Sequence, residues 1–67
     1  MYIVIEIQTT STVATLVNSY DNINQAESKY HQILTAAALS DIPKHGAVLL
    51  NDDGQMLKSE CYEHGGE

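Results

Sequence analysis

The side chains in this sequence that could carry chemistry are few: one cysteine, three histidines and three lysines, with no arginine. Cys61 and His64 stand three residues apart, near Glu60 and Glu63, and all four are of types that bind zinc. Structural zinc sites combine two such pairs, whereas this chain offers one. We therefore predict no metal site, with Cys61 as a small apolar residue of the core and His64 as a solvated tail residue; a metal shared between subunits is the alternative.

A cysteine nucleophile paired with a histidine is a second possibility, because His31 or His45 could approach Cys61 in the folded chain. Such catalysis needs a thiol of lowered pKa, an oriented base and an oxyanion hole. The four glycines occupy turn or tail positions and form neither a nucleophile elbow nor a phosphate-binding loop. The sequence therefore predicts no catalytic residue, no cofactor and a protein that is not an enzyme.

A third cluster brings together a cation, an aromatic ring and an imidazole at consecutive positions. In a helix, Tyr30 would face the core while Lys29 and His31 flank it at the rim. The simplest interpretation is a core tyrosine with solvated neighbours. The functional interpretation is one wall of a ligand site between subunits, and the candidate ligand-binding residues are then Lys29, Tyr30, His31, Lys44, His45 and Tyr62.

Alternating side chains predict the strands that would position these groups. Ile3, Ile5 and Ile7 share one face of the first strand, and Tyr2 and Val4 lie on the other. Polar or glycine-containing turns separate the first strand from the second and the third from the fourth, which favours two hairpins. We expect strands at residues 2–8, 13–19, 45–50 and 55–61.

A single helix is predicted at about residues 22–39. Asp21 is the expected N-cap, and Pro43 lies beyond the end of the helix, which it cannot continue. One face of this helix is apolar and should pack on the sheet. Its members are Ala26, Tyr30, Ile33, Leu34 and Ala37.

The order strand, strand, helix, strand, strand predicts an α+β fold: a ββαββ two-layer sandwich with a four-stranded antiparallel sheet and the helix on one face. We expect one domain over residues 1–67, with a folded core at 1–62 and a frayed tail at 63–67. The strands carry apolar residues on both faces, yet one helix covers only one of them. The sequence therefore predicts a homo-oligomer.

Composition limits the classes of partner. Nine acidic residues against three lysines give a formal net charge of −6, so we expect no nucleic-acid partner. No apolar run is long enough for a membrane helix, the first residues lack a signal peptide's basic segment, and one cysteine cannot form an internal disulfide. We therefore expect a cytoplasmic protein without membrane association. Its acidic surface serves solubility or, alternatively, docks on a basic partner as a nucleic-acid mimic.

Three segments carry a resemblance to known sequences: Tyr2–Gln8, Ala26–His31 and Glu60–His64. The chain resembles small uncharacterised proteins of phages, prophages and mobile elements of gut Firmicutes. That group has no established activity or active site, so the resemblance assigns no functional residue. It implies a context in which small phage proteins counter host defence, and a location in the host cytoplasm.

Three functional hypotheses follow. The leading one is a non-catalytic, homo-oligomeric binding protein, a phage counter-defence factor that sequesters a small nucleotide-like immune signal at a subunit interface. The second is an acidic inhibitor that binds a host defence protein. The third is a structural or scaffolding phage protein.

Overall fold

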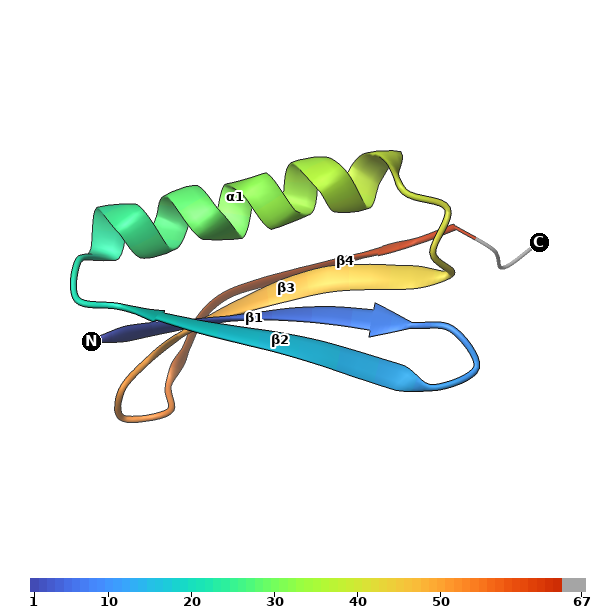
Figure 1. The fold of residues 1–67 in the computed structure, drawn as a ribbon. Helices are drawn as coiled ribbons and strands as arrows, with labels where there is room; N and C mark the ends of the chain where they lie inside the picture. Colours follow the sequence, from blue (N-terminus) through green and yellow to red (C-terminus); the bar gives the residue numbers. More distant parts are fainter. Residues whose placement is uncertain (65–67) are drawn as a thin grey trace.

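The computed structural model describes residues 1–64, which form one sheet and one helix (Figure 1). The order along the chain is strand, strand, helix, strand, strand, as predicted. Each predicted element is present. The first and second strands end one residue later than predicted, and the third is one residue longer at both ends. The fourth begins one residue later and ends two residues later than predicted. The elements are β1 (Tyr2–Thr9), β2 (Val13–Tyr20), α1 (Ile23–Leu39), β3 (Lys44–Asn51) and β4 (Met56–Glu63).

The four strands form one antiparallel sheet in the order β2-β1-β3-β4. β1 and β3 are therefore central, and β2 and β4 are the edge strands. The two hairpins flank the helix in sequence, and β1 pairs with β3 where they meet. This arrangement confirms the predicted α+β fold, with α1 lying along one side of the sheet (Figure 1).

The helix and its N-cap each begin one residue later than predicted. Asn22, not Asp21, is the N-cap: its extended backbone (φ −114°, ψ 130°) lets its side-chain oxygen accept from the Asn24 N–H at 2.7 Å. Ser40 closes the other end, where its N–H donates to the Ala37 carbonyl. In the described part of the chain, α1 is not long and apolar enough to cross a membrane.

The core lies between α1 and the two central strands. Val4 of β1 and Leu49 of β3 are fully buried beneath the helix. The five helix residues predicted to face the sheet are all buried. Two of them, Ala26 and Ala37, are small, which lets the helix axis approach the sheet closely.

The register shows which side chains lie on the opposite face. Val4 faces the helix, so the alternation along β1 turns Ile3, Ile5 and Ile7 away from it. Their cross-strand partners lie on that same face, which we call the uncovered face. Within residues 1–64 no element packs over it (Figure 1). On β1, β2 and β3 its apolar members are Ile3, Ile5, Ile7, Val13, Val17, Val48 and Leu50.

Gly46 was expected in a turn, but it lies within β3, where the β4 backbone approaches it closely. A Cβ at this position would lie 2.4 Å from the Glu60 carbonyl oxygen and 2.8 Å from the Cys61 Cα, so only glycine fits. Gly46 also lines a hollow of about 350 Å³ with Ile7 and Val48. Glycine here therefore permits strand pairing.

The structure extends beyond the predicted core boundary at residue 62. Glu63 is the last residue of β4, and the His64 N–H donates to the Pro43 carbonyl at 2.8 Å. These two residues belong to the tail expected to fray; in the structure Glu63 pairs with Lys44 of β3, and His64 bonds to Pro43 just before β3. The rest of the predicted tail, 65–67, lies outside the described residues.

Candidate functional site

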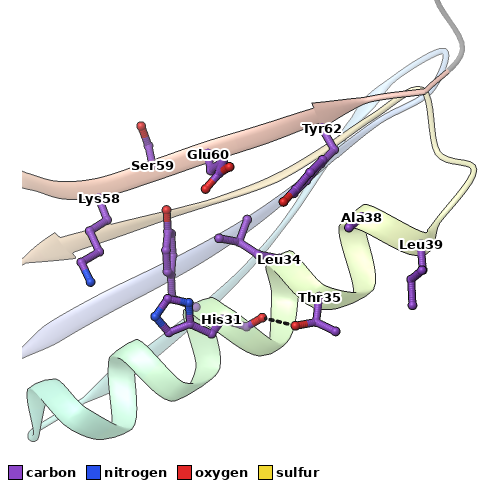
Figure 2. A pocket seen from close by; sticks show the side chains of 10 residues that line it. His31, Leu34, Thr35, Ala38, Leu39, Lys58, Ser59, Glu60 and Tyr62 are labelled. Atoms are coloured by element: carbon purple, nitrogen blue, oxygen red, sulfur yellow. Dashed lines mark hydrogen bonds between the residues drawn. The ribbon is translucent and has the colours of Figure 1, made fainter.

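A hollow of about 810 Å³ lies between the C-terminal half of α1 and β4. We call it the α1–β4 groove. The helix contributes His31, Thr35 and Leu39, and β4 contributes side chains at alternate positions (Figure 2). These strand residues share the helix side of the sheet because they are two residues apart: Lys58, Glu60 and Tyr62.

Opposite charges lie side by side in this groove. The Lys58 Nζ is 3.1 Å from the Glu27 carboxylate, so an ion pair compensates the lysine. Among residues 1–64, Glu60 has no ion pair. Burial raises the pKa of the Tyr30 hydroxyl, and the negative charge of Glu60 raises it further. The uncompensated charge of the groove is therefore negative.

Aromatic rings line the end of the groove nearest the helix C-terminus. The half-buried Tyr62 ring stacks on His64, with centroids 6.3 Å apart and planes within 7°. The His64 Nε2 lies 2.7 Å from the Ala37 carbonyl, one of the last acceptors of the helix. His64 is thereby fixed beside Tyr62, and the Tyr62 ring lines the groove together with Leu34.

Beneath the helix C-terminus, three polar residues form a buried chain of hydrogen bonds. The His45 ring is only 4% exposed, and its Nε2 lies 2.6 Å from a Glu6 carboxylate oxygen. Its Nδ1 lies 3.0 Å from the Ser40 Oγ, which in turn is 3.2 Å from the Ala37 carbonyl. No polar side-chain atom buried within the described residues lacks a partner.

The chain of bonds assigns the protons. A carboxylate accepts, so the His45 Nε2–H donates to Glu6. With a neutral ring, Ser40 donates to Nδ1; with a protonated ring, Nδ1–H donates to Ser40, whose hydroxyl then donates to Ala37. Both nitrogens are thus satisfied in either state.

Opposing effects act on the pKa of the Glu6 carboxyl. Burial acts to raise its pKa, but hydrogen bonds from His45 and Gln8 and the positive charges of His45 and Lys29 outweigh that effect and lower it. Glu6 is therefore held in its charged form beneath the helix.

Serine, histidine and glutamate in this order resemble the groups of a hydrolase triad. Two observations argue for a structural role instead. The Ser40 hydroxyl caps the helix through Ala37, and the His45 ring is out of reach of a substrate because it is buried. The chain joins β1, β3 and the end of α1, and so fixes the helix on the sheet.

Three of the six candidate ligand-binding residues, Tyr30, His31 and Tyr62, line the α1–β4 groove. The other three lie elsewhere. Lys29 borders a shallower hollow beside Tyr20 on the other flank of the helix. His45 is buried in the polar chain, and the exposed Lys44 begins β3 opposite Glu63.

Sequence reasoning missed the two charged residues of the groove. Lys58, Glu60 and Tyr62 are spaced two residues apart in β4. This spacing was the signal that Lys58 and Glu60 lie on the same face of the strand as Tyr62. Glu6 also gave a signal, as an acid within an otherwise apolar strand. Its pairing with His45, 39 residues later, depends on the register between β1 and β3, which no local pattern encodes.

The groups considered for metal binding are not gathered. Among residues 1–64, no three histidine, cysteine, aspartate or glutamate side chains lie close enough to hold an ion. The prediction of Cys61 in the core is wrong: on the edge strand β4 its side chain is exposed. The prediction of a solvated His64 is also wrong, because the ring is half-buried and its Nε2 lies against the Ala37 carbonyl.

Comparison of the chain with family models, curated proteins and solved structures finds no match.

Proposed function

We propose that this protein is a non-catalytic, homo-oligomeric binding protein, in which copies associate through the uncovered face and the α1–β4 groove holds the ligand. One observation carries the proposal: β1 turns its isoleucines away from the helix and presents Glu6 and Gln8 to the helix side. The uncovered side of this central strand is therefore more apolar than the covered side. Such a surface favours burial against another apolar surface.

The distribution of charge supports a second copy as the partner. The protein carries a net charge of −6, which opposes self-association. Within residues 1–64, however, the charged positions of the uncovered face are Lys44 and Glu63, paired in register at one end. Two copies can meet across the remainder of this face without bringing carboxylates together.

The size of the chain supports the same conclusion. At 67 residues, a domain buries only about 60% of the surface its unfolded chain exposes, and its stability margin is small. Covering the face removes Val13 (65% exposed) and Val17 (63% exposed) from water. Each buried valine contributes about 1.5 kcal/mol or more.

The groove supports the binding part of the proposal. It places Tyr62, His31 and Glu60 around one hollow on the side that self-association leaves open. The expected nucleotide-like immune signal stays a prediction, and Glu60 opposes a phosphate group in this groove.

Sedimentation equilibrium of two variants on one strand tests the association. Val17 and Leu16 are neighbours in β2 with similar exposure, 63% and 58%, but Val17 lies on the uncovered face and Leu16 on the helix side. Val17→Lys would bury an unpaired charge, so we expect the dissociation constant to rise about a hundredfold.

Leu16→Lys is the matched control and should associate like the natural chain. A natural chain that remains monomeric at high concentration would refute the proposal. Equal weakening by both lysines would place the contact elsewhere on β2.

A further inference from the structure

We propose that the α1–β4 groove accepts an extended peptide segment of a partner protein, which adds as a fifth strand beside β4 and places a basic side chain against Glu60. This proposal names the partner for the binding role proposed above. It rests on that role but not on self-association.

The first support is the open edge of β4. In the order β2-β1-β3-β4, this strand has β3 on one side and no strand on the other within residues 1–64. Half of the backbone N–H and C=O groups along Met56–Glu63 therefore point outward from the sheet. An edge of this kind accepts an extended peptide through main-chain hydrogen bonds.

The second support is the position of the groove beside that edge. In Figure 2 the side chains of Lys58, Glu60 and Tyr62 point from β4 towards the helix, which forms the facing wall of the groove. An added strand would project alternate side chains to the same side. Those side chains would lie next to Glu60 and Tyr62 at the open side of the groove, so they could contact the groove while the backbone supplies affinity.

The third support is the order of chemistry along β4. Lys58 is paired with Glu27, Glu60 has no ion pair among residues 1–64, and Tyr62 lies by Leu34. A peptide in register would match this order with a basic residue beside Glu60 and, two residues away, an apolar residue beside Tyr62. The groove thus favours an alternating segment with one lysine or arginine.

The other edge strand, β2, also has an open edge but differs in its side chains. It carries no charged residue. Leu16 on its helix side is 58% exposed, so α1 does not form a wall there. Lys29 of α1 borders a hollow beside Tyr20 at one end of β2, but β2 offers no acidic side chain to pair with a basic residue, and this distinguishes the two edges.

Amide exchange and chemical-shift mapping by NMR can test this proposal. The probe is a short blocked peptide of alternating threonine and valine with one central lysine. We expect added protection of outward-facing β4 amides and shift changes at Tyr62. Glu60→Gln should weaken binding about tenfold, because it removes the charge that pairs with the lysine. Asp53→Asn, an acid in the turn before β4, is the control and should leave affinity unchanged.

A second peptide with glutamate in place of lysine should bind the natural chain about tenfold more weakly than the lysine peptide does. The Glu60→Gln variant should bind the two peptides with similar affinity. Protection on β2 instead of β4, equal affinity for the two peptides, or no binding by the lysine peptide would each overturn the proposal.

The Val17→Lys variant separates this proposal from self-association. Val17 lies on the opposite side of the sheet from the groove, so its replacement should leave peptide affinity unchanged. Peptide binding by a monomeric chain would support the groove while refuting the oligomer. Association without peptide binding would do the reverse.

Discussion

The two sides of the sheet differ in what lies on them and in the chemistry they present. On the helix side, Val4 and Leu49 are fully buried, and the polar residues Glu6 and His45 bond to each other. On the other side, Ile5 and Val17 are neighbours across β1 and β2 with nothing over them in residues 1–64. The covered side thus includes charge, and the uncovered side is mostly neutral and apolar.

This difference separates two tasks that a single small domain could perform. A neutral apolar face suits a second copy of an acidic chain, because burial gains free energy and no carboxylates meet. A groove with an uncompensated acid suits a different partner, since charge selects a basic segment. The following changes, from the largest expected effect to the smallest, would break or sharpen this comparison.

Leu49→Ala and Leu50→Ala compare adjacent residues of β3 on opposite sides of the sheet. Leu49 is fully buried beneath the helix, so its truncation should lower the free energy of unfolding by about 3–4 kcal/mol. Leu50 lies on the uncovered face, and its truncation should cost about 1 kcal/mol in dilute solution. Urea unfolding monitored by circular dichroism measures both.

The Leu50→Ala deficit should grow with protein concentration, because association adds burial there. A Leu50→Ala effect as large as that of Leu49→Ala in a dilute monomer would contradict the difference between the faces.

Gly46→Ala tests the strand pairing on which both surfaces depend. The added Cβ would meet backbone atoms of β4 at 2.4 Å and 2.8 Å, so β3 and β4 must separate, at a cost of about 2–3 kcal/mol. Gly54→Ala is the control: φ there is +85° with no atom within 4 Å, and the strained backbone costs about 1 kcal/mol. Thermal unfolding should rank the two in this order.

Glu6→Gln tests the polar chain on the covered side. It replaces a charge-assisted hydrogen bond to His45, so stability at neutral pH should fall by about 1.5 kcal/mol. The folded pKa of Glu6 lies below its ordinary value of 4.5. Its contribution is therefore complete above pH 4.5 and is lost as the pH falls from there through the folded pKa.

Urea midpoints of the natural chain and Glu6→Gln should therefore converge as the pH falls below 4.5. A constant gap across that range would show that Glu6 does not contribute through its charge.

Asn22→Ala tests the observed helix cap against the predicted one. Removing the side-chain acceptor for the Asn24 N–H should cost about 1 kcal/mol. Asp21→Ala should change stability by less, because the Asp21 side chain makes no capping bond in the described structure. A larger effect at Asp21 would restore the cap expected from the sequence.

Local patterns predicted the elements and their order. Alternation along residues 2–8 and the spacing of Ala26, Tyr30 and Ile33 place each side chain on a face, whatever lies around it. The choice between Asp21 and Asn22 was different, because both can cap and only backbone geometry decides between them.

The covered face of the sheet could not be predicted from these patterns. Apolarity alone would place Ile3, Ile5 and Ile7 beneath the helix, but the structure places Val4 and Glu6 there. The covered side is satisfied by pairing Glu6 with His45, a contact across 39 residues. Which candidate residues meet also depends on contacts between distant segments, and only three of the six lie in one groove.

Methyl NMR of a mixed sample tests the central claim most directly. Chains with labelled isoleucine methyls are mixed with chains labelled differently, so that cross-peaks between copies can be isolated. We predict such cross-peaks for Ile5 on the uncovered face and none for Ile33, which is buried on the face of α1 that packs against the sheet. If Ile5 shows no contact with another copy at concentrations where the protein is soluble and folded, the uncovered face is not an interface between copies.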